Sequence, residues 1–169
     1  MDAQITDLVK RTAQTSVRYA AMAGGGLLIL NILSKIPVIG LLFLCIYGLC
    51  SLAAAAGIGY LMAPKISPLP YGQSKPMLAL WIGLGVAIPL TVATTIASVL
   101  GTLFDIAIDH SSYSLIGGLF ALIGSVFGGI IGGLIIGTAL AWLGSFFSLD
   151  KNPNLTAATQ MTQPPARPF

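Results

Sequence analysis

The sequence alternates between four long apolar segments and short polar ones. The apolar segments span about residues 19–33, 38–62, 77–104 and 115–149. A helix needs roughly 20 residues to cross the hydrocarbon core of a bilayer. The last three segments reach that length, and the first can reach it by using the helical turns that precede it. The pattern therefore predicts an all-α, polytopic integral membrane protein, with four transmembrane helices in one domain over residues 19–149.

Residues 1–18 have a different pattern, in which charged side chains separate apolar ones. The apolar positions are Ile5, Leu8, Val9, Ala13 and Val17. Spacings of three and four place these side chains near one face of a helix. We expect a short amphipathic, juxtamembrane helix that lies on the membrane surface or continues into the first span. A solvated helical start without a binding role fits the same pattern.

Small residues recur at every fourth position of the last apolar segment. The first row consists of Gly117, Ala121, Ser125, Gly129, Gly133 and Gly137, and continues to Ala141 and Ser145; the second row consists of Gly124, Gly128 and Gly132. Small residues at this spacing let the backbone of another transmembrane helix come close. We therefore expect small-xxx-small packing, either among the four helices of this chain or, because there are two rows, against another protein.

The predicted spans contain few polar side chains and no Asp, Glu, Lys, Arg or His. Asn31 is the only amide among them, and we expect it to form an interhelical hydrogen bond. Pro89 predicts a kink in the third span, and hydroxyl residues follow it: Thr91, Thr94, Thr95, Ser98 and Thr102. These hydroxyls can line a channel, although such groups more often bond to their own helix. The lack of acidic and basic side chains argues against a pump or a proton-coupled transporter.

The composition agrees with a membrane protein and narrows its function. The chain is 56% hydrophobic and 8% charged, whereas a soluble domain has roughly a quarter charged residues. Its net charge of +3 is spread out, so it forms no basic face for nucleic acid. Cys45 and Cys50 lie five positions apart in an apolar segment, and we interpret them as small, buried hydrophobic residues.

Candidate chemistry is sparse. Asp105, Asp109 and His110 form a weak candidate for a metal site if this segment is helical, but a polar turn is commoner. No motif indicates a nucleophile, a phosphate loop or a cofactor. We therefore expect a protein that is not an enzyme, that has no cofactor, and for which no small-molecule substrate is identified.

The positions of the basic residues predict the orientation. The segments at one end of the spans carry Lys10, Arg11, Arg18, Lys65, Lys75 and Lys151. The loop after the third span has no Lys or Arg, and Lys35 is the one exception at that end. The positive-inside rule then places both termini in the cytoplasm, with the protein in the cell or inner membrane. Residues 150–169 form a Pro-rich tail that we expect to be disordered by itself.

These features favour a non-catalytic structural or accessory subunit, with an assembly or scaffolding role in a larger membrane protein complex. Its expected partners are the lipid bilayer and other membrane subunits, which dock through the glycine rows. The alternative is a small homo-oligomeric channel or carrier, in which the Pro89-kinked third span lines the path.

Overall fold

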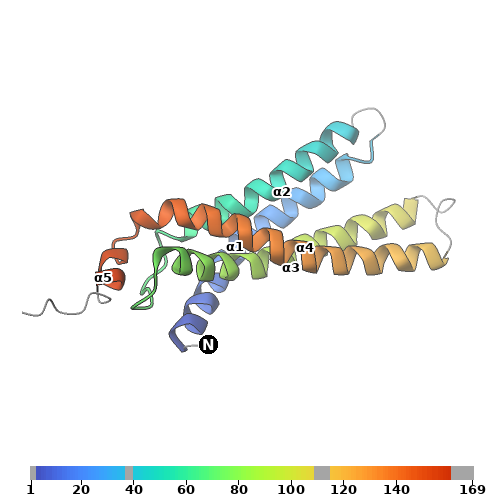
Figure 1. Ribbon diagram of the computed structural model, residues 1–169. Helices are drawn as coiled ribbons and strands as arrows, with labels where there is room; N and C mark the ends of the chain where they lie inside the picture. The colour runs from blue at the N-terminus through green and yellow to red at the C-terminus, as the bar shows by residue number, and fades with distance from the viewer. Residues whose placement is uncertain (1–2, 37–39, 109–114, 161–169) are drawn as a thin grey trace, which may run out of the picture.

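The computed structural model describes residues 3–36, 40–108 and 115–160, which contain helices and no strand. The long helices are α1 (Ala3–Leu33), α2 (Gly40–Met62), α3 (Lys75–Ile108) and α4 (Leu115–Ser148) (Figure 1). A short 3-10 helix, η1 (Leu149–Lys151), and a short α-helix, α5 (Leu155–Gln160), follow them. All four long helices are long and apolar enough to cross a membrane, which supports a multi-pass membrane protein.

The N-terminal segment and the first span form one uninterrupted helix, α1. Buried positions recur along it at intervals of three or four residues, which places them on one face: Ile5, Leu8, Thr12, Ser16, Ala20, Gly24 and Leu27. This face packs on α3, because a Cβ atom added at Gly85 would lie 2.7 Å from Thr12 Cβ, and one added at Gly24 would lie 2.8 Å from Ala93 Cβ. The N-terminal segment is therefore part of the helical bundle.

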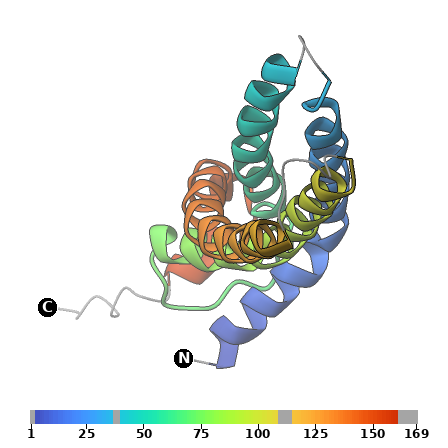
Figure 2. The same cartoon turned by 90° about the vertical axis from the view of Figure 1, so that its right-hand side faces the viewer.

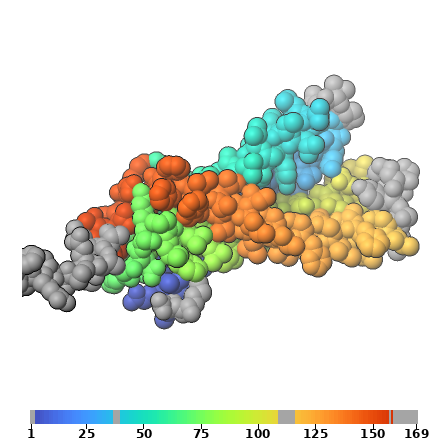
Figure 3. All heavy atoms as spheres, viewed as in Figure 1, coloured from blue at the N-terminus to red at the C-terminus, as the bar shows by residue number. Residues whose placement is uncertain are grey.

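The four long helices form an open curve in the order α2, α1, α3, α4 (Figure 2). We call the end at which α2 ends and α3 begins the base, and the opposite end, near Leu33 and Ile108, the open end. At the base α4 returns to contact α2. Towards the open end α2 diverges from α4, and Figure 3 shows the start of α2 standing apart from α4.

At the base, α2 and α4 touch through their backbones. A Cβ atom added at Gly59 would lie 2.9 Å from Ala141 Cα, and one added at Gly144 would overlap the carbonyl group of Ala56. The Ser145 hydroxyl also donates a hydrogen bond of 3.2 Å to the carbonyl oxygen of Gly59. Larger side chains at these glycines would force the two helices apart.

The expectation of a disordered tail is wrong for residues 150–160, which include the end of η1 and the whole of α5 at the base. The buried Asn152 side-chain amide donates to the carbonyl oxygens of Ala63 (2.8 Å) and Ile66 (2.9 Å). Carbonyls after a helix end have no partner within that helix, so Asn152 supplies one. Ala158 is buried in the apolar cluster of the base and accepts a hydrogen bond from the Gly72 amide. Residues 161–169 lie outside the described residues.

Two other expectations concern α2 and α3. Cys45 and Cys50 are exposed on α2, so the interpretation of both as buried residues is wrong. The reason is that this part of α2 lies away from the base contact with α4. Helix α3 continues through Pro89 to Ile108. Of the hydroxyl residues that follow Pro89, Thr94 donates to the Leu90 carbonyl oxygen of the same helix at 2.9 Å.

Candidate functional site

A cleft lies between α2 and α4 where the two helices diverge, and α3 closes its back. We call it the α2–α4 cleft; it has a volume of about 220 Å³. Glycines of both rows line its α4 side: Gly128, Gly129, Gly132, Gly133 and Gly137. Hydroxyl groups from α2 and α3 line the rest of it, together with apolar side chains: Tyr47, Ser51, Thr91, Thr94 and Ser98. The cleft therefore brings together residues from both sets of candidates that the sequence indicated.

The first glycine row faces α3. A Cβ atom added at Gly133 would lie 2.7 Å from Thr91 Oγ1, and one added at Gly129 would lie 2.7 Å from Thr95 Oγ1. At Gly137 the nearest atom would be Ala87 Cβ, at 3.7 Å. These positions are thus occupied by a contact within the chain. Three members of this row lie nearer the open end and are half-buried: Gly117, Ala121 and Ser125.

The second glycine row faces free space. A Cβ atom added at Gly124, Gly128 or Gly132 would meet nothing within 4 Å among the described residues. Gly128 and Gly132 line the α2–α4 cleft. This part of α4 therefore presents bare backbone that no described segment of the chain covers.

The hydroxyls of α3 fall into two groups. Thr94 bonds to Leu90 within its own helix, and Thr102 Oγ1 donates to the Ser98 carbonyl oxygen at 3.0 Å. Thr91 Oγ1 and Thr95 Oγ1 are buried and have no hydrogen-bond partner among the described residues. A buried polar group without a partner costs about 1–3 kcal/mol. Of these two, Thr91 lines the cleft.

The other candidate residues lie away from the cleft. Asn31 packs on α3, where a Cβ atom added at Gly101 would lie 2.9 Å from the oxygen and the nitrogen of the Asn31 amide. Asp105 forms an ion pair with Lys35, at 2.8 Å. Asp109 and His110 lie outside the described residues, so the structure does not place them with Asp105. Within the described ranges no three His, Cys, Asp or Glu side chains come together to hold a metal ion.

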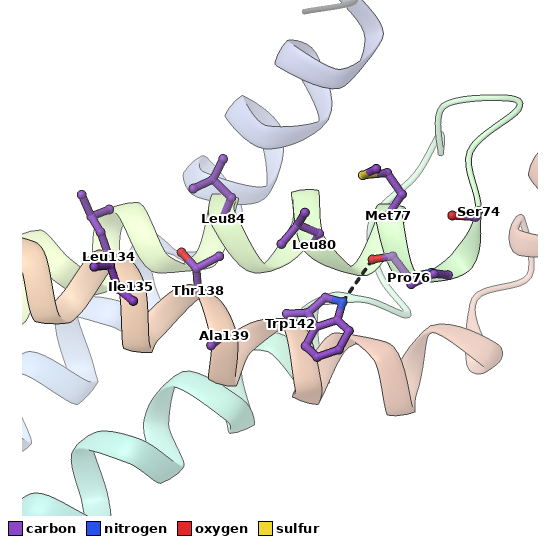
Figure 4. Close-up of a pocket in the computed structure, with 10 residues that line it drawn as sticks. All are labelled: Ser74, Pro76, Met77, Leu80, Leu84, Leu134, Ile135, Thr138, Ala139 and Trp142. Carbon is purple, nitrogen blue, oxygen red and sulfur yellow. Dashed lines mark hydrogen bonds between the residues drawn. The ribbon is translucent and has the colours of Figure 1, made fainter.

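A second hollow lies on the outer face of α3 and α4 near the base (Figure 4). No sequence pattern indicated it. This α3–α4 groove has a volume of about 750 Å³ and apolar walls that include Leu80, Leu84 and Leu134. Trp142 lies at one end of it and donates from Nε1 to the Pro76 carbonyl oxygen at 3.1 Å. The polar groups of the groove are few: Ser74, Thr138 and the indole N–H of Trp142.

Comparison with known proteins finds no family model, no curated protein and no solved structure that matches this chain. The geometry of the α2–α4 cleft is therefore the basis for assigning a role.

Proposed function

We propose that this protein is a non-catalytic accessory subunit of a membrane protein complex, and that the α2–α4 cleft docks a transmembrane helix of another subunit. One observation carries the proposal: Gly128 and Gly132 line the cleft, and neither has an atom within 4 Å of the place where a side chain would begin. A row of bare backbone in a membrane cleft is a surface suited to a helix.

Helices in a bilayer associate through close van der Waals packing, because lipid tails are as apolar as the helices themselves. Small residues favour such packing by letting backbones approach. In this chain Gly129 and Gly133 already serve the contact between α3 and α4. The second row makes no such contact. Because α2 diverges from α4, this row stays accessible from the side on which α2 lies.

The hydroxyl groups of the cleft add a polar element to this surface. Thr91 Oγ1 is buried without a partner among the described residues, and Ser51 and Ser98 lie in the same cleft. A polar side chain on an incoming helix would bond to Thr91 and remove the cost of leaving its hydroxyl unpaired. Interhelical hydrogen bonds of this kind contribute about 0.6 kcal/mol on average in membranes, enough to help fix the register of a docked helix.

Affinity purification in mild detergent tests the proposal. The wild-type chain should carry companion polypeptides in fixed stoichiometry, and the Gly128→Leu and Gly132→Leu variants should lose them while unfolding at the wild-type temperature. Leu134→Ile, a change on the same helix that keeps side-chain size, should retain them. Companions that stay bound to both leucine variants would contradict docking at the second row.

Leucine at Gly129 or Gly133 is also expected to disrupt assembly, but these variants are poorer tests of docking. Their side chains would collide with Thr95 and Thr91 inside the chain. A loss of companions would then follow from a disturbed fold as readily as from a blocked cleft.

The alternative function is a small homo-oligomeric channel or carrier with α3 lining its path. The observation in its favour is that Thr91, Thr94 and Ser98 present hydroxyls to the cleft opposite Ser51. Purification as a ring of identical chains, with no companion polypeptide, would favour this function over the accessory role.

We further propose that the base lies on the cytoplasmic side of the cell or inner membrane. Arg11, Arg18, Lys65 and Lys75 all belong to the base, whereas Lys35 lies at the open end. Basic residues near span ends are retained on the cytoplasmic side. Both termini would then be cytoplasmic.

A further inference from the structure

The cations of the base divide into those that pair with a carboxylate and those that do not. Among the described residues, Arg11 pairs with Asp7 and Lys75 with Asp150 at the base, and Lys35 pairs with Asp105 at the open end. Lys151 instead donates to the hydroxyl of Tyr60. Lys10, Arg18 and Lys65 have no acidic partner among the described residues. Their charge is therefore available to a ligand.

One of these cations, Arg18, lies in the middle of a groove on α1. It has a volume of about 520 Å³ and is lined by Gln14, Thr15, Arg18, Tyr19 and Met22. Lys65, in the segment after α2, is not one of the lining residues, but its Nζ lies 5.9 Å from the centre of the Tyr19 ring, which does line the groove. We call this hollow the α1 groove.

The α1 groove crosses the boundary between the polar and the apolar part of its helix. Arg18 is the last charged residue of α1, and the apolar segment begins at Tyr19. From Gln14 to Met22 the helix rises by about 12 Å, so the groove extends from charged surface into the hydrocarbon region. Met22 lies at the apolar end, with 76% of its surface exposed.

We propose that the α1 groove binds an anionic phospholipid, with Arg18 and Lys65 at the headgroup phosphate and an acyl chain along Met22. The two cations supply the charge, while the Gln14 amide and the Thr15 hydroxyl supply polar contacts beside them. A free phosphate ion would fill the charged end and leave the apolar end empty, whereas a phospholipid fills both. This site is separate from the α2–α4 cleft and does not rest on the docking function.

The test uses the purified full-length chain in detergent, titrated with phosphatidylglycerol or phosphatidylcholine and followed by native mass spectrometry. The wild-type chain should prefer phosphatidylglycerol. One cation near an anionic membrane surface contributes about fivefold to binding. The double variant Arg18→Gln with Lys65→Gln should therefore bind phosphatidylglycerol about 25-fold more weakly, and should lose most of its preference over phosphatidylcholine, in which the choline cation already offsets the phosphate charge.

A matched control removes the same charge from paired positions. Lys35→Gln with Lys75→Gln should change the affinity for phosphatidylglycerol by less than about twofold, because those cations are engaged by aspartates. The proposal is overturned if the Arg18 and Lys65 variant keeps the wild-type preference, or if the control loses as much affinity.

Soluble glycerol phosphate separates a lipid site from a phosphate site. It carries the headgroup charge and no acyl chain, so it should not displace phosphatidylglycerol at equal concentration. Met22→Gln should weaken phosphatidylglycerol binding without any change in charge. Displacement by glycerol phosphate, together with an unaffected Met22 variant, would identify a site for the phosphate group alone and overturn the lipid assignment.

Discussion

Gly144 of α4 lies so close to Ala56 of α2 that a Cβ atom added to the glycine would overlap the alanine carbonyl group, and it would also lie 3.0 Å from the amide nitrogen of Tyr60. Each of these neighbouring atoms belongs to the backbone of α2. Neither helix can relieve such an overlap by rotating a side chain, so the closeness of α2 and α4 at the base depends on this glycine.

The replacement Gly144→Ala should therefore destabilise the protein, even though alanine is the better helix former. Overpacking of a tight contact costs about 1–3 kcal/mol. Gly128→Ala is the matched control on the same helix, because its new Cβ atom would meet nothing within 4 Å. We expect the control to be neutral or more stable by up to about 1 kcal/mol, in line with helix propensity. Denaturant unfolding in detergent, followed by circular dichroism, measures both, and equal stabilities would contradict the assigned contact.

Asn152 provides a second prediction, on how the C-terminal segment is held. Its side-chain amide bonds to the carbonyl oxygens of Ala63 and Ile66, and the residue is 3% exposed. Asn152→Ala should lower the free energy of unfolding by about 1–3 kcal/mol, because two acceptors lose their donor. Asn154→Ala removes an exposed hydrogen bond to Ser67 and should change it by less than about 0.5 kcal/mol. A similar loss of unfolding free energy in both variants would show that the two buried hydrogen bonds of Asn152 contribute no more than the exposed one of Asn154.

The ion pair between Lys35 and Asp105 joins the end of α1 to α3 at the open end. The two side chains are 41% and 27% exposed, so their coupling should not exceed about 1 kcal/mol. A double-mutant cycle with Lys35→Gln and Asp105→Asn measures that coupling, and we expect it to shrink as salt is added. A coupling that does not respond to salt would mean that the pair is shielded from solvent.

The proposed orientation predicts which side of the membrane carries residue 112. A cysteine at Ser112 should react with an impermeant maleimide in intact cells. Cys45 and Cys50 are exposed on α2, so both should first be replaced by alanine. Labelling only after the cells are permeabilised would reverse the orientation and place the base outside.

The sequence was sufficient to predict four helices that are long and apolar enough to span a membrane, because the length of an apolar segment is a direct physical requirement of the bilayer. It could not decide whether residues 1–18 formed a separate surface helix, since charges at Lys10, Arg11 and Arg18 are compatible with either arrangement. Thr12, in the N-terminal part of α1, packs against Gly85 of α3. These two residues are far apart in the chain, so a local sequence pattern does not reveal the contact.

The cleft and the C-terminal helix illustrate the limit of a local pattern. Both glycine rows have the same spacing, and what distinguishes them is the position of α3, which covers Gly133 and leaves Gly132 open. Similarly, nothing near Asn152 in the sequence shows that two carbonyls at the end of α2 need a donor. The α1 groove is lined by residues 14–22 alone, but nothing in that stretch of sequence shows that Lys65, from a different segment, lies near Tyr19.

The contact between α2 and α4 at the base restricts how the α2–α4 cleft can be reached. At Gly59 and Gly144 the backbones of α2 and α4 are in contact. A molecule therefore cannot pass between these two helices at the base. Entry is then through the gap that α2 leaves as it diverges from α4 towards the open end. With the long helices spanning the bilayer, as we propose, that gap would face the lipid, and the cleft would take up molecules that already reside in the membrane.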